Sequence, residues 1–294
     1  MESFKRGYEF MKQSWQMALA DRDLLKPSIY ALLAGFLVTL ITMLPMAAIG
    51  FFLGDFGIGR AILYIMGALL VFVQFIVTYI FSAMTVYLIY GYLAEGDGRM
   101  DKAWAVVKRD FWDIASLAAA STAVKVVRDL LKGKKRGGLG DMLGNLLGVL
   151  WTEATYLVLP AMVIEDLNLK DGLKRAGQIV RDNLLLVGIS TVGVRAVVGL
   201  ISFLLSALGI VLGVGVAVGL ISVFTGSPWA VVLAVVLAIL IATPFILVAA
   251  VINSYTSTAY HTCLYLWARD VERAQQSGQP VDVSAPAPLA AVLG

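Results

Sequence analysis

The stretch "AILYIMGALLVFVQFIVTYIFSAMTVYLIYGYL", residues 61–93, decides the fold class, because it carries no charged side chain from end to end. An α-helix needs about 20 apolar residues to cross the hydrocarbon core of a bilayer. This stretch is longer than that, so the helix it predicts either tilts in the membrane or projects beyond it. The sequence therefore indicates an integral membrane protein built from helices.

The composition of the whole chain agrees with this class. Of its 294 residues, 60% are hydrophobic and 15% are charged. In soluble proteins about a quarter of all residues are charged. The net charge of +3, spread over the predicted loops, argues against a nucleic-acid partner. The chain has one cysteine, Cys263, and one histidine, His261. A histidine metal site or a Ser–His–Asp triad would therefore have to use His261 as its single histidine. We expect no metal, no cofactor and no enzymatic activity.

The apolar segments predict an all-α, polytopic membrane protein with about six transmembrane helices and an N-terminal amphipathic helix. Residues 206–225, rich in Gly and Val, extend the fifth span, re-enter the membrane or form an extra crossing. Residues 27–272 are expected to form one membrane domain, followed by an irregular Pro/Ala-rich tail, 273–294. Besides residues 61–93, the expected spans are 28–54, 111–131, 143–164, one from about residue 184, and a last helix from about 229 to 273.

Residues 1–26 are expected to form an interfacial helix. Aromatic and apolar side chains recur there at three- and four-residue steps and therefore share one face of a helix. Basic residues lie beside this face, which suits the surface of a lipid bilayer. A helix packed on the cytoplasmic side of its own protein would show the same pattern. The expected anchoring residues are Phe4, Tyr8, Met11 and Trp15.

The basic residues predict the orientation of the chain in the cell (inner or plasma) membrane. They cluster at 5–26, 94–110, 165–183 and 269–273, and six spans with a cytoplasmic N-terminus would place all four clusters inside, as the positive-inside rule requires. The cluster of Lys132, Lys134, Lys135 and Arg136 would then lie outside. Either the rule is violated there, or residues 111–131 do not cross and belong to a partial hairpin whose charged tip must reach water or protein.

Glu153 is the most informative polar residue, because it lies in the apolar stretch "GVLWTEATYLVLPAMVIED", residues 148–166. An ionised carboxylate at bilayer depth costs at least about 3 kcal/mol unless it is paired. Arg195, in the fifth span, is the natural partner, and the pair would tie the fourth and fifth spans together. The alternatives are a proton- or ion-coupled site and a Glu153 that lies closer to the membrane surface.

Two further patterns concern helix packing. Asn253, Ser257 and His261 are spaced by four residues and form a polar face on the last helix, which lines a cavity or makes interhelical hydrogen bonds. The sequence favours a structural role for His261. The glycine pairs 209/213 and 215/219 each match the small-xxx-small pattern of closely packed helices.

Short motifs recur along most of the chain, up to about residue 272: Phe4 with Gly7, Trp151 with Ala154, Thr155 and Pro160, Leu173 with Arg175 and Ala176, and Ala259–Tyr260 with Leu264–Tyr265–Leu266. They resemble those of uncharacterised bacterial and archaeal membrane proteins related to the glycerophosphodiester phosphodiesterase membrane domain. The chain departs from their pattern at Glu153 and at its basic loop "KGKKRGG". The resemblance implies a multi-pass fold without established catalytic residues. No phosphodiesterase domain is present, so that activity is not expected.

Three functions remain open at this point. The favoured one is a non-enzymatic membrane protein that forms a homo-oligomer and acts as a scaffold or organiser of membrane components, with other membrane proteins as further candidate partners. The alternative is a transporter or lipid-handling protein with a polar intramembrane cavity around Glu153 and Arg195. An intramembrane enzyme would need a nucleophile, base or metal set around Glu153 or His261, and it is the least favoured of the three.

Overall fold

The computed structural model describes residues 2–53, 56–132, 138–182, 184–224, 228–277 and 283–293, and each regular element in these ranges is a helix. The all-α fold expected from the sequence is confirmed. The basic residues 134–136 lie outside the described ranges. The elements are α1 (Glu2–Ala20), a 3₁₀ turn η1 (Arg22–Leu24), α2 (Lys26–Leu53), α3 (Gly57–Glu95), α4 (Met100–Arg109), α5 (Phe111–Lys132), α6 (Leu139–Glu165), α7 (Leu169–Asp182), α8 (Leu184–Val223), α9 (Pro228–Gln276) and α10 (Ala287–Leu293).

Within the described residues, five helices are long and apolar enough to cross a membrane. They include α2, α3, α6, most of α8 and nearly all of α9, so the chain has the helices of a membrane protein. The expected span at 111–131 forms helix α5 but is not among the five, because its second half carries Lys125, Arg128 and Asp129. Residues 206–223 continue α8 without a break, so they extend the fifth predicted span.

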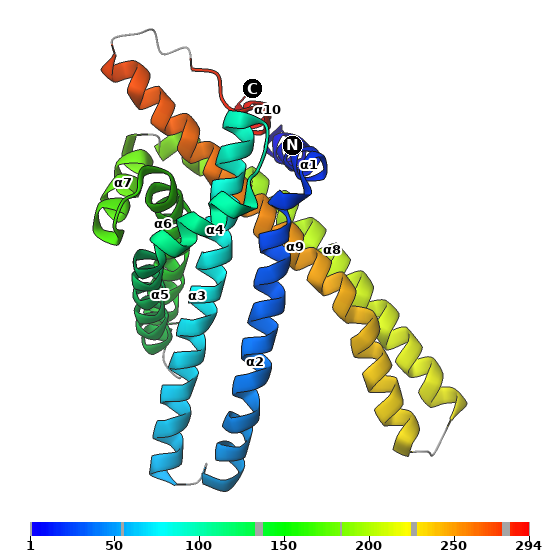
Figure 1. Ribbon diagram of the computed structural model, residues 1–294. Helices are drawn as coiled ribbons and strands as arrows, with labels where there is room; N and C mark the ends of the chain where they lie inside the picture. Colours follow the sequence, from blue (N-terminus) through cyan, green and yellow to red (C-terminus); the bar gives the residue numbers. More distant parts are fainter. Residues whose placement is uncertain are drawn as a thin grey trace.

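The chain is packed tightly at one end only, which we call the cap. Figure 1 shows α2–α3 and α8–α9 as two long hairpins that separate as they leave this end, where both chain termini lie. Their far halves expose apolar side chains; for example, Leu44 and Phe51 of α2 are 72% and 85% exposed. This pattern fits helices surrounded by lipid. The largest fully buried side chains all lie in the cap: Phe10, Leu24, Leu88, Ile89, Ile114, Leu117, Leu157, Met162, Ile179, Tyr255, Tyr260 and Tyr265.

Helices α5 and α6 form a shorter hairpin against α3. Ser121 of α5 accepts a hydrogen bond from Trp151 Nε1 at 2.9 Å and shares one with the Tyr79 hydroxyl at 2.7 Å, so these three residues lie at one level. From this level α3 runs on for about 33 Å to Gly57, whereas α6 runs back for only about 18 Å to Leu139. The tip of the α5–α6 hairpin therefore stops well short of the α2–α3 loop (Figure 1).

Helix α1 crosses α8 at two glycines. A Cβ atom on Gly7 would lie 2.5 Å from the carbonyl oxygen of Gly193, and a Cβ atom on Gly193 would collide with the backbone of Ser3. Such a close approach of two backbones requires residues without a side chain. It gives a physical reason for glycine at position 7, which the sequence pattern had marked only as a recurring residue.

The buried face of α1 is adjacent to the predicted anchoring face but does not coincide with it. Phe10 packs edge-on against Tyr260, and the Tyr255 hydroxyl donates to Ser14 O at 3.0 Å. Of the predicted anchoring residues, Trp15 donates to the hydroxyl of Thr256, Met11 is half-buried, and Phe4 and Tyr8 remain exposed. Helix α1 therefore packs on its own protein through one face and presents aromatic side chains outward on another.

The C-terminal tail is more regular than the sequence suggests. An irregular segment was expected after residue 273, but α9 continues to Gln276 and residues 287–293 form the short helix α10. Leu289 and Val292 are buried, and Arg6 of α1 donates to Val292 O at 3.2 Å. Burial of these apolar side chains against α1 explains why a Pro/Ala-rich segment becomes helical here.

We predict that Gly7→Ala destabilises the protein by about 1–3 kcal/mol, because the added methyl group has no space at the α1–α8 crossing. The matched control is Gly177→Ala in α7, where a Cβ atom would meet nothing within 4 Å. Removing the backbone freedom of that glycine should stabilise the helix by about 0.5–1 kcal/mol. Thermal unfolding of both variants in detergent measures the two effects, and shifts of the same sign would contradict the described crossing.

Candidate functional site

Three polar side chains from three helices meet near the cap. Arg195 of α8 forms an ion pair with Oε1 of Glu153 in α6, and Nε2 of His261 in α9 lies 3.3 Å from Oε2 of the same carboxylate. The side chains of His261 and Glu153 are 3% and 26% exposed. We call these residues the ion-pair cluster. The partner expected for Glu153 is thus in place, together with a histidine that the sequence did not connect to it.

The hydrogen bonds of His261 indicate which of its ring nitrogens carries a hydrogen. Its Nδ1 lies 2.7 Å from the carbonyl oxygen of Ser257. A carbonyl oxygen can only accept, so Nδ1 carries a hydrogen, and Nε2 of a neutral ring then faces Glu153 with a lone pair. A hydrogen bond between Nε2 and the carboxylate therefore requires one further proton, on either residue.

Tyr156 separates this cluster from a cavity. Its ring stacks on the His261 imidazole with centroids 4.4 Å apart and planes at 9°, while Tyr260 meets the imidazole edge-on at 5.0 Å. On its other side, Tyr156 lines a cavity of about 450 Å³ between α3, α5, α6 and α9, which we call the inner cavity. Asn253 also lines this cavity, whereas Glu153, Arg195, Ser257 and His261 do not.

The wall of the inner cavity combines apolar and hydroxyl side chains. Its best-connected polar group is the hydroxyl of Ser121, which bonds Tyr79 and Trp151 and so joins α3, α5 and α6. Lys125 and Arg128 of α5 bring positive charge to the wall. The remaining lining residues that matter here are Phe75, Val86 and Leu159, which are apolar, and Ser82, Thr155, Ser254 and Thr258, which carry hydroxyls.

A second cavity of about 740 Å³ lies between α2, α3 and α9, and we call it the outer cavity. Phe75, Thr78, Lys125 and Ser254 line both cavities, so the two adjoin. Gln74 lies in the wall of the outer cavity and donates to Gly35 O and to the Thr39 hydroxyl, each at 2.8 Å. The sequence analysis did not connect Gln74, Thr78 or Lys125 with a site.

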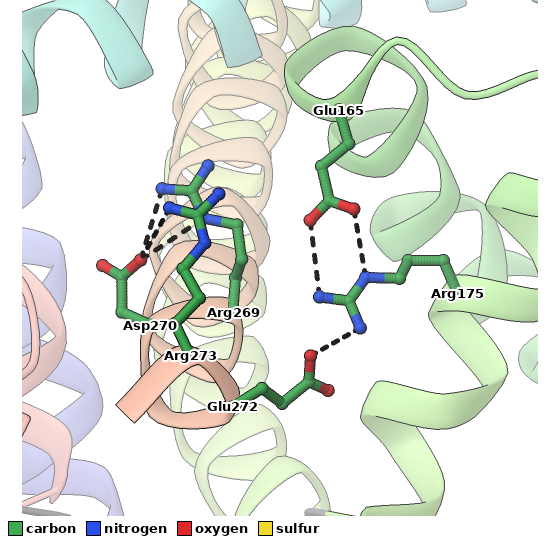
Figure 2. Close-up of polar contacts among 6 residues, drawn as sticks. All are labelled: Glu165, Arg175, Arg269, Asp270, Glu272 and Arg273. Atoms are coloured by element: carbon green, nitrogen blue, oxygen red, sulfur yellow. Dashed lines mark hydrogen bonds and ion pairs between the residues drawn. The ribbon is translucent and has the colours of Figure 1, made fainter. Parts of the chain in front are cut away.

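A charged network fastens α6, α7 and α9 within the cap. Figure 2 shows Arg175 of α7 between two carboxylates, with Nη1 at 2.5 Å from Glu272 and Nε at 3.2 Å from Glu165. Partial burial alone would lower the pKa of the Arg175 guanidinium, but the hydrogen bonds and charges of Glu272 and Glu165 outweigh it and raise this pKa. Arg175 therefore stays charged over the whole working range of pH.

Arg269 and Arg273 lie beside this network, and both are turned toward Asp270 in Figure 2. Together with Arg175, Glu165 and Glu272 they surround a polar hollow of about 490 Å³. The three guanidinium groups contact three carboxylates, so the described charges of this hollow balance one another. We interpret the hollow as a structural junction of three helices, because no excess charge is left there to attract a ligand.

Comparisons with known proteins give a family but no activity. The model of a family of unknown function (DUF6159) matches residues 58–275, and the chain belongs to this family. No curated protein matches the chain. The matched residues run from the start of α3 to the end of α9, so they include the ion-pair cluster and the inner cavity. The resemblance to proteins related to the glycerophosphodiester phosphodiesterase membrane domain stays a prediction.

We predict that Glu153→Ala destabilises the protein by about 1–3 kcal/mol, because it leaves Arg195 and the Nε2 atom of His261 without their partner. Glu153→Gln should cost less, since the amide can donate a hydrogen bond to the Nε2 lone pair. The measurement is thermal unfolding of the detergent-solubilised variants.

The control for this pair is Glu95→Ala, which removes an exposed contact with Lys102 and should change stability by less than about 1 kcal/mol. Equal losses for the alanine and glutamine variants of Glu153 would show that His261 gains nothing from a donor at that position.

Proposed function

We propose that this member of the family is a non-enzymatic integral membrane protein that binds lipid molecules in its joined inner and outer cavities. The observation that carries the proposal is the pair of adjoining cavities, each within the range of about 300–1,000 Å³ in which small molecules bind. Their walls are mainly apolar with scattered hydroxyls, which suits an amphiphile. The outer cavity lies between α2 and α9, whose far halves expose apolar side chains, so lipid can enter from the bilayer.

The distribution of basic residues supports a cytoplasmic cap and N-terminus in the cell membrane. The basic residues of α4 and α7 and the pair Arg269 and Arg273 lie at the cap end. At the opposite end of the two hairpins, the sequence between α2 and α3 and between α8 and α9 contains no lysine or arginine, and Arg60 in the first turn of α3 is the nearest basic residue. Positive loops are retained in the cytoplasm. Helix α1 then lies at the cytoplasmic surface with Phe4 and Tyr8 free to contact the bilayer.

Six helices enter the membrane in this arrangement, but they do so in two ways. Helices α2, α3, α8 and α9 cross it completely. Helices α5 and α6 enter and leave on the cytoplasmic side as a partial hairpin, which the short reach of α6 supports. This topology brings the four basic clusters at 5–26, 94–110, 165–183 and 269–273 to the cytoplasmic side. It replaces an external basic loop after Lys132 with a hairpin tip whose charges must reach water or protein.

Contacts between α2 and α3 support a position of Glu153 near the cytoplasmic membrane surface. The ring centroids of Tyr30 and Phe81 are 6.2 Å apart. Phe81 therefore lies about one helical turn farther from the cap than Lys26. Glu153 is about 3 Å nearer to the cap than Trp151, which is level with Tyr79. It therefore lies close to the level of Phe81. The inner cavity extends to both sides of this level, because Val86 and Leu159 line it on the cap side and Thr78 lines it on the other side.

A non-enzymatic role is supported by the surroundings of the two most reactive side chains. The Cys263 thiol is fully buried. The His261 imidazole is enclosed by Tyr156 and Tyr260 and bonded at both ring nitrogens. Neither group faces the cavities, so neither can reach a molecule bound there.

We predict that Thr78→Trp weakens lipid binding at least about tenfold, or by about 1.4 kcal/mol, because the indole would fill the space that both cavities share. Thr78 is exposed, so the larger side chain does not disturb the core. Binding of a fluorescent phospholipid to the purified protein measures the effect.

The matched control is Ile65→Trp on the same helix, at a position that is 69% exposed and outside both cavities. It should leave lipid binding unchanged. Unchanged binding in Thr78→Trp would rule out the cavities as the lipid site.

A homo-oligomeric scaffold is the second candidate, and the glycines of α8 favour it. Gly209 and Gly213 pack against α9, where a Cβ atom would meet Phe245 or Ala238. A Cβ atom on Gly215 or Gly219 would meet nothing within 4 Å among the described residues. The second glycine pair is therefore open to a helix of another subunit, as the small-xxx-small pattern allows.

For this candidate we predict that the double variant Gly215→Leu, Gly219→Leu lowers the native mass of the lipid-containing protein to that of a monomer. The bulky side chains would keep a second helix from close approach. Gly67→Leu on α3, another glycine with open space around it, is the control. A monomeric wild-type protein, or an oligomer that survives the double substitution, would contradict the scaffold.

A further inference from the structure

We infer that the joined cavities select a phospholipid with net negative charge, whose phosphate group lies against Lys125 and Arg128 of α5. This inference rests on the proposed lipid binding and adds the chemical class of the lipid. Lys125 lines both cavities and Arg128 lines the inner one. Both side chains come from the second half of α5, which the hairpin carries into the bilayer.

The charges around these two residues do not balance. Lys125 Nζ lies 2.8 Å from Asp129 Oδ2, and Arg128 Nε lies 3.4 Å from Oδ1 of the same carboxylate. Two cations therefore share one described carboxylate. Neither cavity has an Asp or Glu among its described lining residues. One positive charge is left over at a wall that otherwise consists of apolar and neutral polar groups.

The depth of this charge makes a partner necessary. Lys125 and Arg128 lie about 6 Å and about 10 Å further along α5 than Ser121, away from the cap. An unpaired cation at such a depth is costly in a bilayer and is met where it has a counter-ion or water. The phosphate of an acidic lipid is a counter-ion that the membrane itself supplies, and its acyl chains can follow the apolar wall of the outer cavity.

Neutral polar groups are placed to complete the site. Asn253 and Ser254 of α9 line the inner cavity across from α5 and can bond the oxygens of a head group. The guanidinium of Arg128 offers paired donors that match a phosphate, whereas Lys125 acts as a point charge. The head group of a zwitterionic lipid also carries a positive charge, which would lie close to Lys125 and Arg128. Such a lipid therefore gains less binding free energy. The geometry thus favours lipids whose head group carries no compensating positive charge.

The test compares two lipids with identical chains, phosphatidylglycerol and phosphatidylcholine, bound to the purified full-length protein and counted by native mass spectrometry. The wild-type protein should prefer phosphatidylglycerol at least about tenfold. The double variant Lys125→Gln, Arg128→Gln should lose this preference and keep its phosphatidylcholine, which also shows that it is folded. Asp129→Asn should strengthen the preference. The double variant Lys170→Gln, Lys174→Gln, an equal charge change at exposed sites of α7, should leave it unchanged.

The outcomes separate this inference from the proposed function. Equal binding of the two lipids by the wild-type protein would overturn the charge selection and leave lipid binding intact. Failure to bind either lipid would overturn both. Displacement of phosphatidylglycerol by millimolar inorganic phosphate would show that the site takes a free anion in place of a lipid. A preference that persists in the double variant would remove Lys125 and Arg128 from the site.

Discussion

Contacts between the α2–α3 hairpin and the α8–α9 hairpin are concentrated in the cap, where Tyr255, Tyr260 and Tyr265 of α9 are buried. The far halves of the hairpins expose their apolar side chains. In lipid these surfaces gain little from packing on one another, because lipid chains are as apolar as the side chains. The cap therefore fixes the angle between the hairpins, and the space between them depends on it.

Helices α5 and α6 pack against α3 (Figure 1), and their polar groups contribute to the chemistry of the inner cavity. Polar groups inside a bilayer must be bonded within the protein or face a polar cavity. The Ser121 hydroxyl meets the first condition through Tyr79 and Trp151, and Glu153 meets it through Arg195 and His261. The charges of Lys125 and Arg128 are only partly balanced within the protein. A ligand site is therefore inferred there and not at the network around Arg175, where the charges balance.

Helix type, the long apolar spans and the pairing of Glu153 with Arg195 could be predicted from the sequence, because each follows from local composition or from the cost of an unpaired charge. The contact of Glu153 with His261 could not, since it depends on α6 and α9 meeting across 108 positions of the chain. The face of α1 that packs on the rest of the protein could not be predicted either, for a related reason. Aromatic side chains dominate its periodicity, but the close contact with α8 is made through Gly7, which has no side chain for a hydrophobic pattern to register.

Labelling of single cysteines tests the central claim, that α5 and α6 form a hairpin with both ends on the cytoplasmic side. In a Cys263→Ala background, a membrane-impermeant maleimide would be applied to each face of sealed vesicles that carry Ile58→Cys, Met142→Cys or Lys170→Cys. Ile58 and Met142 are 76% and 66% exposed, so both positions accept the label wherever water reaches them. We expect labelling of position 58 from outside, of position 170 from the cytoplasmic side, and of position 142 never from outside. External labelling at position 142 would show that α5 and α6 cross the membrane and would contradict the account.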